Sequence, residues 1–344
     1  MKTTITLVLA LLLVGPPVAS RAGLVGHDRL AEVADDVHVV VGSARRIGED
    51  RVEIRLTHTL RSPPGRGIPR AVTVPAGDLR FSPPGGAQGI FLLRQAGGRY
   101  TMAGAQNPAV VLPAGLPVGA GDYAAITVDL LGRAIEQDDK SLCLSAGHPQ
   151  CAGSEASAIR DRAVVALVEF KGQRSRAVLE RLACDPRLDV AVHGHGGLAQ
   201  LGVFGRGTDI SGLISRPTPA SLPALHTLGG AMCREGLPRE ARPAVLLLLG
   251  STDAALRHDG ACGLRALSEP TDLPLWSRLL TDSDQRVRYY AASAVAGLYT
   301  GRYVTTQHFR DNEAQVMGEV MAWMAEGPPR IREEPMQVAV PAHD

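Results

Sequence analysis

The first third of the chain carries the alternation of apolar and polar residues that is typical of β-strands. Residues 52–60, Val-Glu-Ile-Arg-Leu-Thr-His-Thr-Leu, follow this pattern, and such a strand buries one face and exposes the other. Gly, Pro and Asp residues separate it from other runs rich in Val, Ile and Leu. The pattern predicts strands at 37–47, 52–60, 71–75, 89–93 and 100–103. Short strands joined in this way predict a small barrel.

The spacing of apolar residues becomes helical in the second half of the chain. A segment rich in Pro, Gly and Ala at 105–122 predicts a boundary between two domains. After it, Tyr123–Ile135 is predicted as a helix because its apolar residues recur at helical spacing. Residues 136–156 are predicted as a polar loop.

The later helical segments repeat. Residues 252–267 and 283–298 match at a constant offset of 31 residues, with an apolar residue, an Arg, two small residues and a Leu at corresponding places. Residues 184–201 match at close to three such periods. Asp253 and Asp284 precede the second helix of their copies, where a carboxylate caps free backbone N–H groups. The sequence therefore predicts a stack of helix pairs.

The clearest copy, Leu279–Leu298 (LLTDSDQRVRYYAASAVAGL), resembles HEAT repeats of the short bacterial, PBS-lyase-like type. This resemblance implies an α-solenoid over residues 157–326, closed by a capping helix at 312–325. It also implies an extended inner surface that holds partners. A lyase activity is not expected, because no particular residues support it.

The strands resemble the OB-like barrel of netrin-type domains over residues 35–115. Val40-Val41-Gly42 matches the pattern of the first strand, and Ile90-Phe91-Leu92-Leu93 with Tyr100 matches the fourth strand and the Tyr after its turn. Related barrels inhibit metalloproteases through an N-terminal Cys. This mechanism does not carry over, because no Cys precedes Cys143.

Together these patterns predict an α+β multidomain protein, with a small OB-like β-barrel followed by a short all-α HEAT-type solenoid. The expected segments are a signal peptide at 1–22, the barrel at 23–115, a linker with a helix and a disulfide loop at 116–156, the solenoid at 157–326 and a flexible tail at 327–344.

The N-terminus has the features of a secretory signal. Lys2 provides a positive charge, and Ile5–Val14 is an apolar stretch that is too short to span a membrane. Cleavage is expected after Ser20 or Ala22. We therefore expect an exported protein, periplasmic or secreted, without an integral membrane segment after removal of the signal.

Export makes disulfides possible for the five cysteines. Cys143 and Cys151 are predicted to pair, since Gly and Pro residues between them turn the chain. Cys184, Cys233 and Cys262 lie in helical patterns, where we expect small buried apolar residues, and the sequence leaves their pairing state open. The odd number of cysteines leaves at least one unpaired, and no C-x-x-C motif indicates zinc.

Charge and aromatic content narrow the possible functions. The chain has 36 basic and 35 acidic residues, a net charge of +1, which argues against a nucleic-acid partner. It has five Phe, six Tyr and two Trp. Its cores must therefore be built from Leu, Val, Ile and Ala.

No motif in the sequence predicts catalysis. His193 and His195 could suggest a metal site, but residues two apart on a helix do not share a face, and no third ligand lies near them in the sequence. No G-x-S-x-G nucleophile motif occurs. We therefore expect a protein that is not an enzyme and has neither cofactor nor metal.

The second helices of the repeats carry the candidate binding residues Arg257, His258, Arg265, Arg288 and Tyr289. Two interpretations stay open for the arginines, a surface that binds a partner and a structural ladder of ion pairs with the next repeat. The leading hypothesis is an adaptor or scaffold that binds a protein or peptide. The alternative is a regulator, or a protein with a ligand site or a cryptic enzymatic site, in the cleft between barrel and solenoid.

Overall fold

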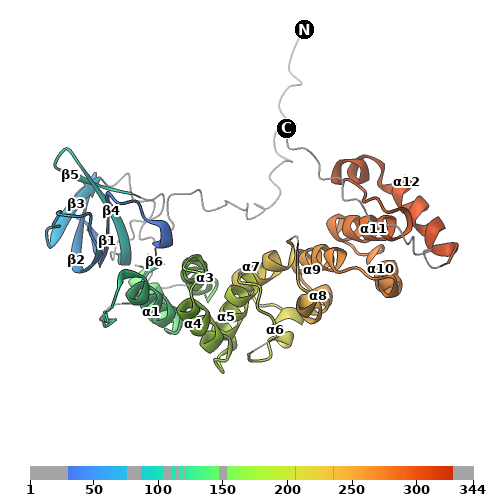
Figure 1. The fold of residues 1–344 in the computed structure, drawn as a ribbon, viewed down its shortest axis with the longest axis horizontal. Helices are drawn as coiled ribbons and strands as arrows, with labels where there is room; N and C mark the ends of the chain where they lie inside the picture. Colours follow the sequence, from blue (N-terminus) through green and yellow to red (C-terminus); the bar gives the residue numbers. More distant parts are fainter. Residues whose placement is uncertain are drawn as a thin grey trace, which may run out of the picture.

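A barrel at one end and a row of paired helices make up the part of the chain that the computed structural model describes (Figure 1). The described residues are 30–75, 87–103, 110–113, 116–119, 121–146, 153–205, 207–234 and 236–327. The expected signal peptide lies outside these ranges, as does all of the expected tail after Gly327. The α+β fold class is confirmed, with the barrel followed by helices.

The barrel strands have the antiparallel order β3-β2-β1-β4-β5, and β3 comes close to β5 so that the sheet nearly closes. A short sixth strand pairs with β4 beyond the end of β5. The bounds are β1 Val37–Arg46, β2 Arg51–Arg61, β3 Ala71–Pro75, β4 Ala87–Ala96, β5 Arg99–Met102 and β6 Val110–Val111.

Strands β1 and β4 are buried on both faces. Val40 pairs with Phe91 and both point into the barrel, whereas the neighbouring pair Val39 and Leu92 belongs to a second core. That second core continues into the first helix and contains Leu131. A strand covered on both sides reads as an unbroken apolar run, which explains the Val-rich sequence of β1.

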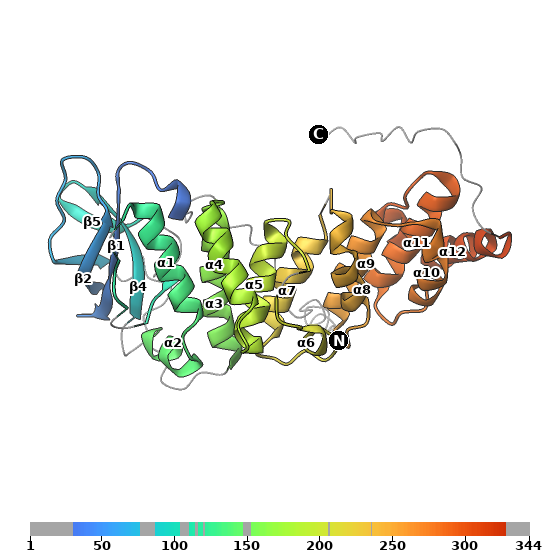
Figure 2. The same ribbon diagram turned by 60° about the horizontal axis from the view of Figure 1, so that its bottom comes forward.

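The helices form two layers. Helices α3, α5, α7, α9 and α11 contact one another in sequence and form the inner layer, while α1, α4, α6, α8 and α10 lie outside them. The row bends into an arc, with α7, α9 and α11 on its inner side (Figure 1), and in the turned view the helices follow one another along its length (Figure 2). The bounds are α1 Tyr123–Ile135, α2 Asp139–Ser145, α3 Gly153–Glu169, α4 Gln173–Ala183, α5 Leu188–Gln200, α6 Ser211–Ser215, α7 Leu222–Met232, α8 Arg242–Leu249, α9 Ala254–Ala266, α10 Leu273–Leu279, α11 Gln285–Thr300 and α12 Thr306–Ala325.

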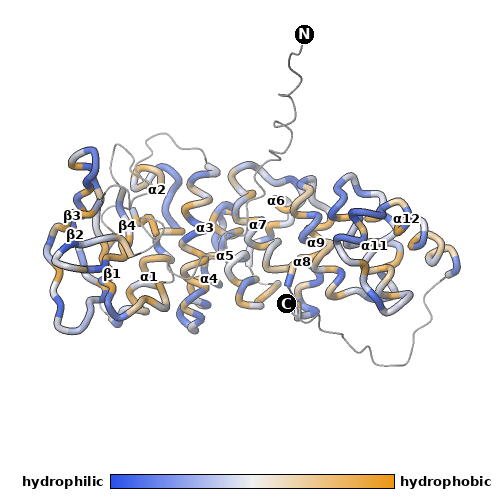
Figure 3. The backbone as a smooth tube through the Cα atoms, turned by 90° about the horizontal axis from the view of Figure 1, so that it is seen from above, coloured by the Kyte–Doolittle hydropathy of each residue, from blue (hydrophilic) through white to orange (hydrophobic). Residues whose placement is uncertain are grey.

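The predicted caps are present. The Asp253 carboxylate accepts a hydrogen bond from the Leu256 amide at 3.0 Å, and the Asp284 carboxylate accepts one from the Arg286 amide at 2.8 Å. Hydrophobic and hydrophilic positions alternate in short stretches along the helices (Figure 3), as expected for helices buried on one face. The prediction of a polar loop at 136–156 is wrong in part, since this segment contains helix α2, whose first turn is capped by the Asp138 side chain, and the start of α3 at Gly153.

Glycines allow α5 to pack closely on its neighbours. A Cβ atom on Gly194 would lie 2.2 Å from the backbone nitrogen of Ala183, and one on Gly197 would lie 2.5 Å from a methyl carbon of Leu179. Both glycines are buried in the middle of α5. These residues lower helix propensity, but they let α5 approach α4 more closely than alanine would.

Candidate functional site

Arg257 connects two consecutive repeats. Its Nε and Nη2 atoms lie 2.8 Å and 3.0 Å from the two carboxylate oxygens of Asp282, and its Nη1 donates to the carbonyl oxygens of Ser251 and Thr252. Hydrogen bonding to Asp282 raises the pKa of Arg257, and the same contact lowers the pKa of Asp282. All three nitrogen atoms of the Arg257 guanidinium thus donate to groups within the protein.

Arg288 repeats this arrangement one period later. Its Nε lies 2.7 Å from Glu313 Oε1, and its Nη1 donates to the carbonyl oxygens of Asp282 and Ser283. Each partner of Arg288 lies 31 positions after the corresponding partner of Arg257 in the sequence. Of the two interpretations left open by the sequence, the structure places Arg257 and Arg288 in the structural ladder.

Three side chains of α9 face away from the outer layer. His258, Cys262 and Arg265 lie roughly half a helical turn from Gly260 and Gly263, which contact α8. They therefore belong to the inner side of the arc.

Arg265 lies between two tyrosines on this side. Its guanidinium carbon is 5.3 Å from the ring centroid of Tyr290 on α11 and 5.1 Å from that of Tyr303, which follows α11. The His258 ring lies 5.2 Å from the Tyr290 ring. We call His258, Arg265, Tyr290 and Tyr303 the inner-face patch. Tyr290 and Tyr303 are members that the sequence interpretation missed, and the one local signal for Tyr290 is its position next to Tyr289.

The remaining predicted residue, Tyr289, is partly covered. Its ring lies 4.9 Å from the Tyr290 ring and 5.7 Å from the ring of Phe309 in α12. Tyr289 therefore holds helix α12 against α11 and supports Tyr290 from the side.

A disulfide lies beneath the inner-face patch. Cys233, at the end of α7, is bonded to Cys262 of α9, with 5.1 Å between their Cα atoms. The Cys233 sulfur lies 4.0 Å from the Tyr290 hydroxyl. The sequence left the pairing state of these two cysteines open, and the structure assigns them to one disulfide. The separation of 29 residues is close to one repeat and places both residues on adjacent inner helices.

Cys184 and Cys143 are the two remaining cysteines among the described residues. Cys184 is a free thiol, but it is exposed, contrary to expectation, because it lies at the C-terminal end of α4. Cys143 is disulfide-bonded. Its expected partner, Cys151, lies outside the described residues, so the pairing stays a prediction.

A Ser-His-Asp group lies between α3, α5 and α7. The Ser157 Oγ is 3.2 Å from His193 Nε2, His193 Nδ1 is 3.9 Å from Asp161 Oδ1, and the Thr227 hydroxyl donates to that same carboxylate at 2.7 Å. Burial is the main cause that lowers the pKa of His193 to about 3 and raises that of Asp161 to about 6.

This group is not arranged for nucleophilic catalysis. Ser157 and His193 are 3% and 1% exposed, so no substrate reaches the hydroxyl. The nearby His195 ring is engaged elsewhere, 2.9 Å from the Thr208 carbonyl oxygen. Within the described parts of the chain, no group of three His, Cys, Asp or Glu side chains is placed to hold a metal ion.

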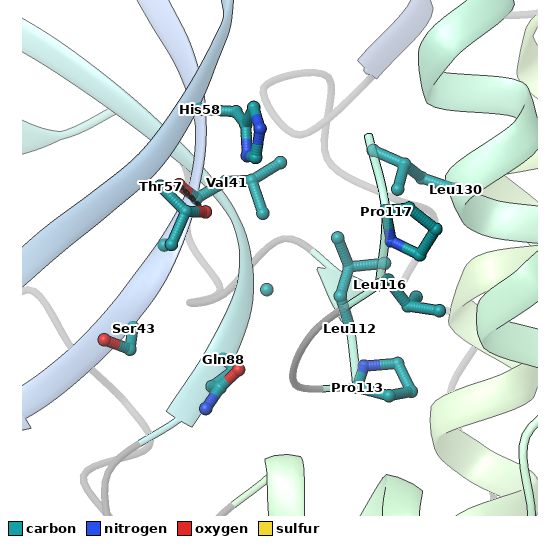
Figure 4. Close-up of a pocket in the computed structure, with 12 residues that line it drawn as sticks. Val41, Ser43, Thr57, His58, Gln88, Leu112, Pro113, Leu116, Pro117 and Leu130 are labelled. Atoms are coloured by element: carbon teal, nitrogen blue, oxygen red, sulfur yellow. Dashed lines mark hydrogen bonds between the residues drawn. The ribbon is translucent and has the colours of Figure 1, made fainter. Parts of the chain in front are cut away.

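A cleft of about 390 Å³ lies between the barrel and α1 (Figure 4). Barrel strands supply Val41, Gly42, Ser43, Thr57, His58, Gln88 and Gly89, and the other wall consists of Leu112, Pro113, Leu116, Pro117 and Leu130. The sequence suggested a cleft between the two parts but none of these residues. The irregular Thr-His-Thr run at 57–59 is the local signal that marks this wall.

Two further observations concern the whole chain. No helix among the described residues combines the length and the apolar character needed to cross a membrane. Comparisons with protein-family models, with curated proteins and with solved structures found no match for this chain.

Proposed function

We propose that this protein is an exported, non-enzymatic adaptor, in which a netrin-like barrel precedes a HEAT-type solenoid that binds an acidic segment of a partner protein on its inner face. The observation that carries the proposal is the position of Arg265. Its guanidinium stacks between Tyr290 and Tyr303, and no carboxylate among the described residues pairs with it.

The contrast with the neighbouring arginines supports this assignment. Arg257 and Arg288 are held by carboxylates and backbone carbonyls of the next repeat, and Arg286 pairs with Asp284. Arg265 instead has no hydrogen bond or ion pair among the described residues, and its guanidinium carbon lies over two aromatic rings. A preoriented arginine beside tyrosines is typical of the residues that dominate protein interfaces.

The charges around the patch favour an acidic peptide over a nucleic acid. A carboxylate would form a charge-assisted pair with the Arg265 fork. A phosphate backbone needs many cations to bind, and the inner-face patch offers one permanent cation, Arg265, beside the carboxylates of Asp253 and Asp259 in the same helical layer. The disulfide at Cys233–Cys262 supports export, since such bonds persist in oxidising compartments.

The test uses the whole mature chain as bait in an envelope extract, with chemical cross-linking and mass spectrometry to identify retained proteins. Arg265→Ala and Tyr303→Ala are compared with Arg239→Ala, whose side chain is 88% exposed outside the patch. We expect one protein to be retained by the wild type and by Arg239→Ala but not by the patch variants.

Titration of the purified partner against each variant gives the dissociation constants that test the inner-face patch. Loss of the Arg265 contact should weaken binding by at least about tenfold, the factor that corresponds to about 1.4 kcal/mol. Equal affinity of wild type and Arg265→Ala would reject the inner-face patch as the binding site. A specific catalytic turnover of the purified protein would reject the adaptor itself.

A further inference from the structure

The geometry points to a second binding site, independent of the adaptor surface. We propose that the cleft between the barrel and α1 binds an uncharged, amphipathic small molecule. The molecule would place its hydrogen-bonding edge on the barrel and its hydrocarbon side on the segment before α1. The volume of about 390 Å³ lies within the range of small-molecule sites.

The barrel wall offers unused hydrogen-bonding groups. The side chains of Ser43, His58 and Gln88 line the cleft and have no hydrogen-bond partner among the described residues. The Thr57 hydroxyl donates to the Val41 carbonyl at 3.1 Å and keeps its lone pairs for a ligand. In Figure 4, His58 and Thr57 extend from the barrel strands on one side of the opening, with Gln88 below them.

A β-bulge brings Thr57 and His58 to the same cleft. Consecutive residues of a regular strand point to opposite faces. Here Val41 pairs with His58 and Gly42 pairs with Leu56, so Thr57 is left unpaired, and both Thr57 and His58 line the cleft. Bulges redirect side chains in this way and are frequent beside functional sites.

Glycine makes the bulge possible. A Cβ atom on Gly42 would lie 2.5 Å from the Arg55 carbonyl oxygen, a distance that no other residue tolerates. Gly42 also pairs with Gly89 of β4. The floor of the cleft between these two strands therefore carries no side chains at this point.

The opposite wall is apolar and fixed in place. It consists of Leu112, Pro113, Leu116, Pro117 and Leu130. Arg133 of α1 donates to the Pro117 carbonyl at 3.1 Å, and the Leu112 amide donates to the Gln88 carbonyl at 3.0 Å. The two walls are thus tied to each other through the backbone at Gln88, so the cleft is formed before a ligand arrives.

The absence of charge in the lining defines the ligand class. Among the lining residues of the cleft there is no Asp, Glu, Lys or Arg. A charged group in the slot would lose hydration without gaining a permanently charged counter-ion, since His58 is the one titratable side chain of this lining. A molecule with one polar edge and one hydrocarbon side satisfies both walls.

Two fluorescent probes with the same ring skeleton test this inference. N-phenyl-1-naphthylamine is neutral and has one N–H donor, while 8-anilinonaphthalene-1-sulfonate adds a sulfonate. We expect the neutral probe to bind the full mature chain saturably, with one molecule per chain, and the anionic probe to bind at least about tenfold more weakly.

Three variants locate the binding. Ser43→Phe fills the cleft and Leu116→Asp places a charge on its apolar wall, and each should weaken binding of the neutral probe by at least about tenfold. Thr73→Phe adds the same ring at an exposed position of β3 outside the cleft and should leave binding unchanged. Leu116 is only partly buried, so Leu116→Asp serves if Ser43→Phe does not fold.

The remaining outcomes overturn the inference. Absence of saturable binding to the wild type rejects the site, and equal binding of wild type and the folded cleft variants places the probe elsewhere. Equal affinity for both probes rejects an uncharged ligand. Arg265→Ala should not change binding of the probe, because Arg265 lies on α9 and is not among the residues that line the cleft.

Discussion

The Arg257 guanidinium binds the Asp282 carboxylate through two parallel hydrogen bonds of 2.8 Å and 3.0 Å, across the junction between two repeats. Both groups are largely buried, at 16% and 11% exposure. A buried ion pair of this kind contributes little relative to apolar packing, but loss of one partner leaves an uncompensated charge.

Arg257→Met should therefore destabilise the protein by about 2–4 kcal/mol, because Asp282 loses its partner. Arg176→Met is the matched control. Arg176 forms an exposed i,i+4 pair with Glu180, and such pairs are worth about 0.5 kcal/mol. Urea denaturation followed by circular dichroism measures both values. A loss at Arg257 no greater than that at Arg176 would refute the structural ladder.

Removal of the Cys233–Cys262 disulfide should lower the free energy of unfolding by about 3–4 kcal/mol, as expected when a loop of this length is opened in the unfolded chain. The variant is Cys233→Ala with Cys262→Ala, which leaves Cys143 untouched. Cys184→Ala is the control and should change stability by less than about 0.5 kcal/mol. Similar effects in both variants would contradict the assigned pairing.

The His193 and Asp161 pair predicts a particular pH dependence of stability. The folded pKa of His193, about 3, lies below the value of an unfolded histidine, so its contribution is present above pH 6.5 and is lost as the pH falls toward 3. The folded pKa of Asp161, about 6, lies above the unfolded value. Its contribution is full below pH 3.8 and is lost as the pH rises through 6. Between these limits the two effects oppose each other.

Asp161→Asn should therefore steepen the loss of stability on acidification. The asparagine can still accept from Thr227, while His193 alone then costs about 2 kcal/mol between pH 7 and pH 5. Urea midpoints at pH 5, 6 and 7 give the slope. His193→Gln should reverse the sign of this slope, because Asp161 is then the group of the pair that titrates, and its contribution to stability grows as the pH falls. Identical slopes for wild type and Asp161→Asn would show that this carboxylate does not titrate with a raised pKa.

Two glycine substitutions should have opposite effects. Gly194→Ala pushes a methyl group into the Ala183 backbone and should cost more than about 1 kcal/mol, because backbone must move. Gly318 lies in α12 with open space around it. Gly318→Ala should increase stability by about 1 kcal/mol through helix propensity alone. The unfolding temperatures of the two variants give the test. If Gly194 served no role in close packing, Gly194→Ala would raise the unfolding temperature as Gly318→Ala does.

Local pattern was sufficient to predict most of the elements. The alternation at 52–60 and the helical spacing from Tyr123 to Ile135 depend on neighbours in the sequence, and the helix α1 has those bounds. The offset between repeats correctly placed the capping carboxylates of Asp253 and Asp284. Such features follow from burial of one face and from backbone groups at helix ends.

The sites depend on contacts that the sequence does not display. The partner of Cys233 lies one repeat away, and nothing near it in the chain distinguishes it from a buried thiol. The cleft requires the unpaired Thr57 of β2 and the extended segment around Leu116 to meet. Similarly, Arg265 resembles Arg257 and Arg288 in sequence, and only the packing of Tyr303 against it sets it apart.

The core shared by the barrel and α1 has a practical consequence. Val39 and Leu92 on the strands and Leu131 on the helix belong to one apolar cluster. Separation of the chain at the predicted linker would therefore expose apolar residues of both pieces to water. An α-solenoid needs a terminal cap with a polar outer surface, and here the barrel fills that role for the first helices. The boundary drawn from composition is thus a poor place to cut the gene for expression of single domains. The two parts are better treated as one cooperative unfolding unit.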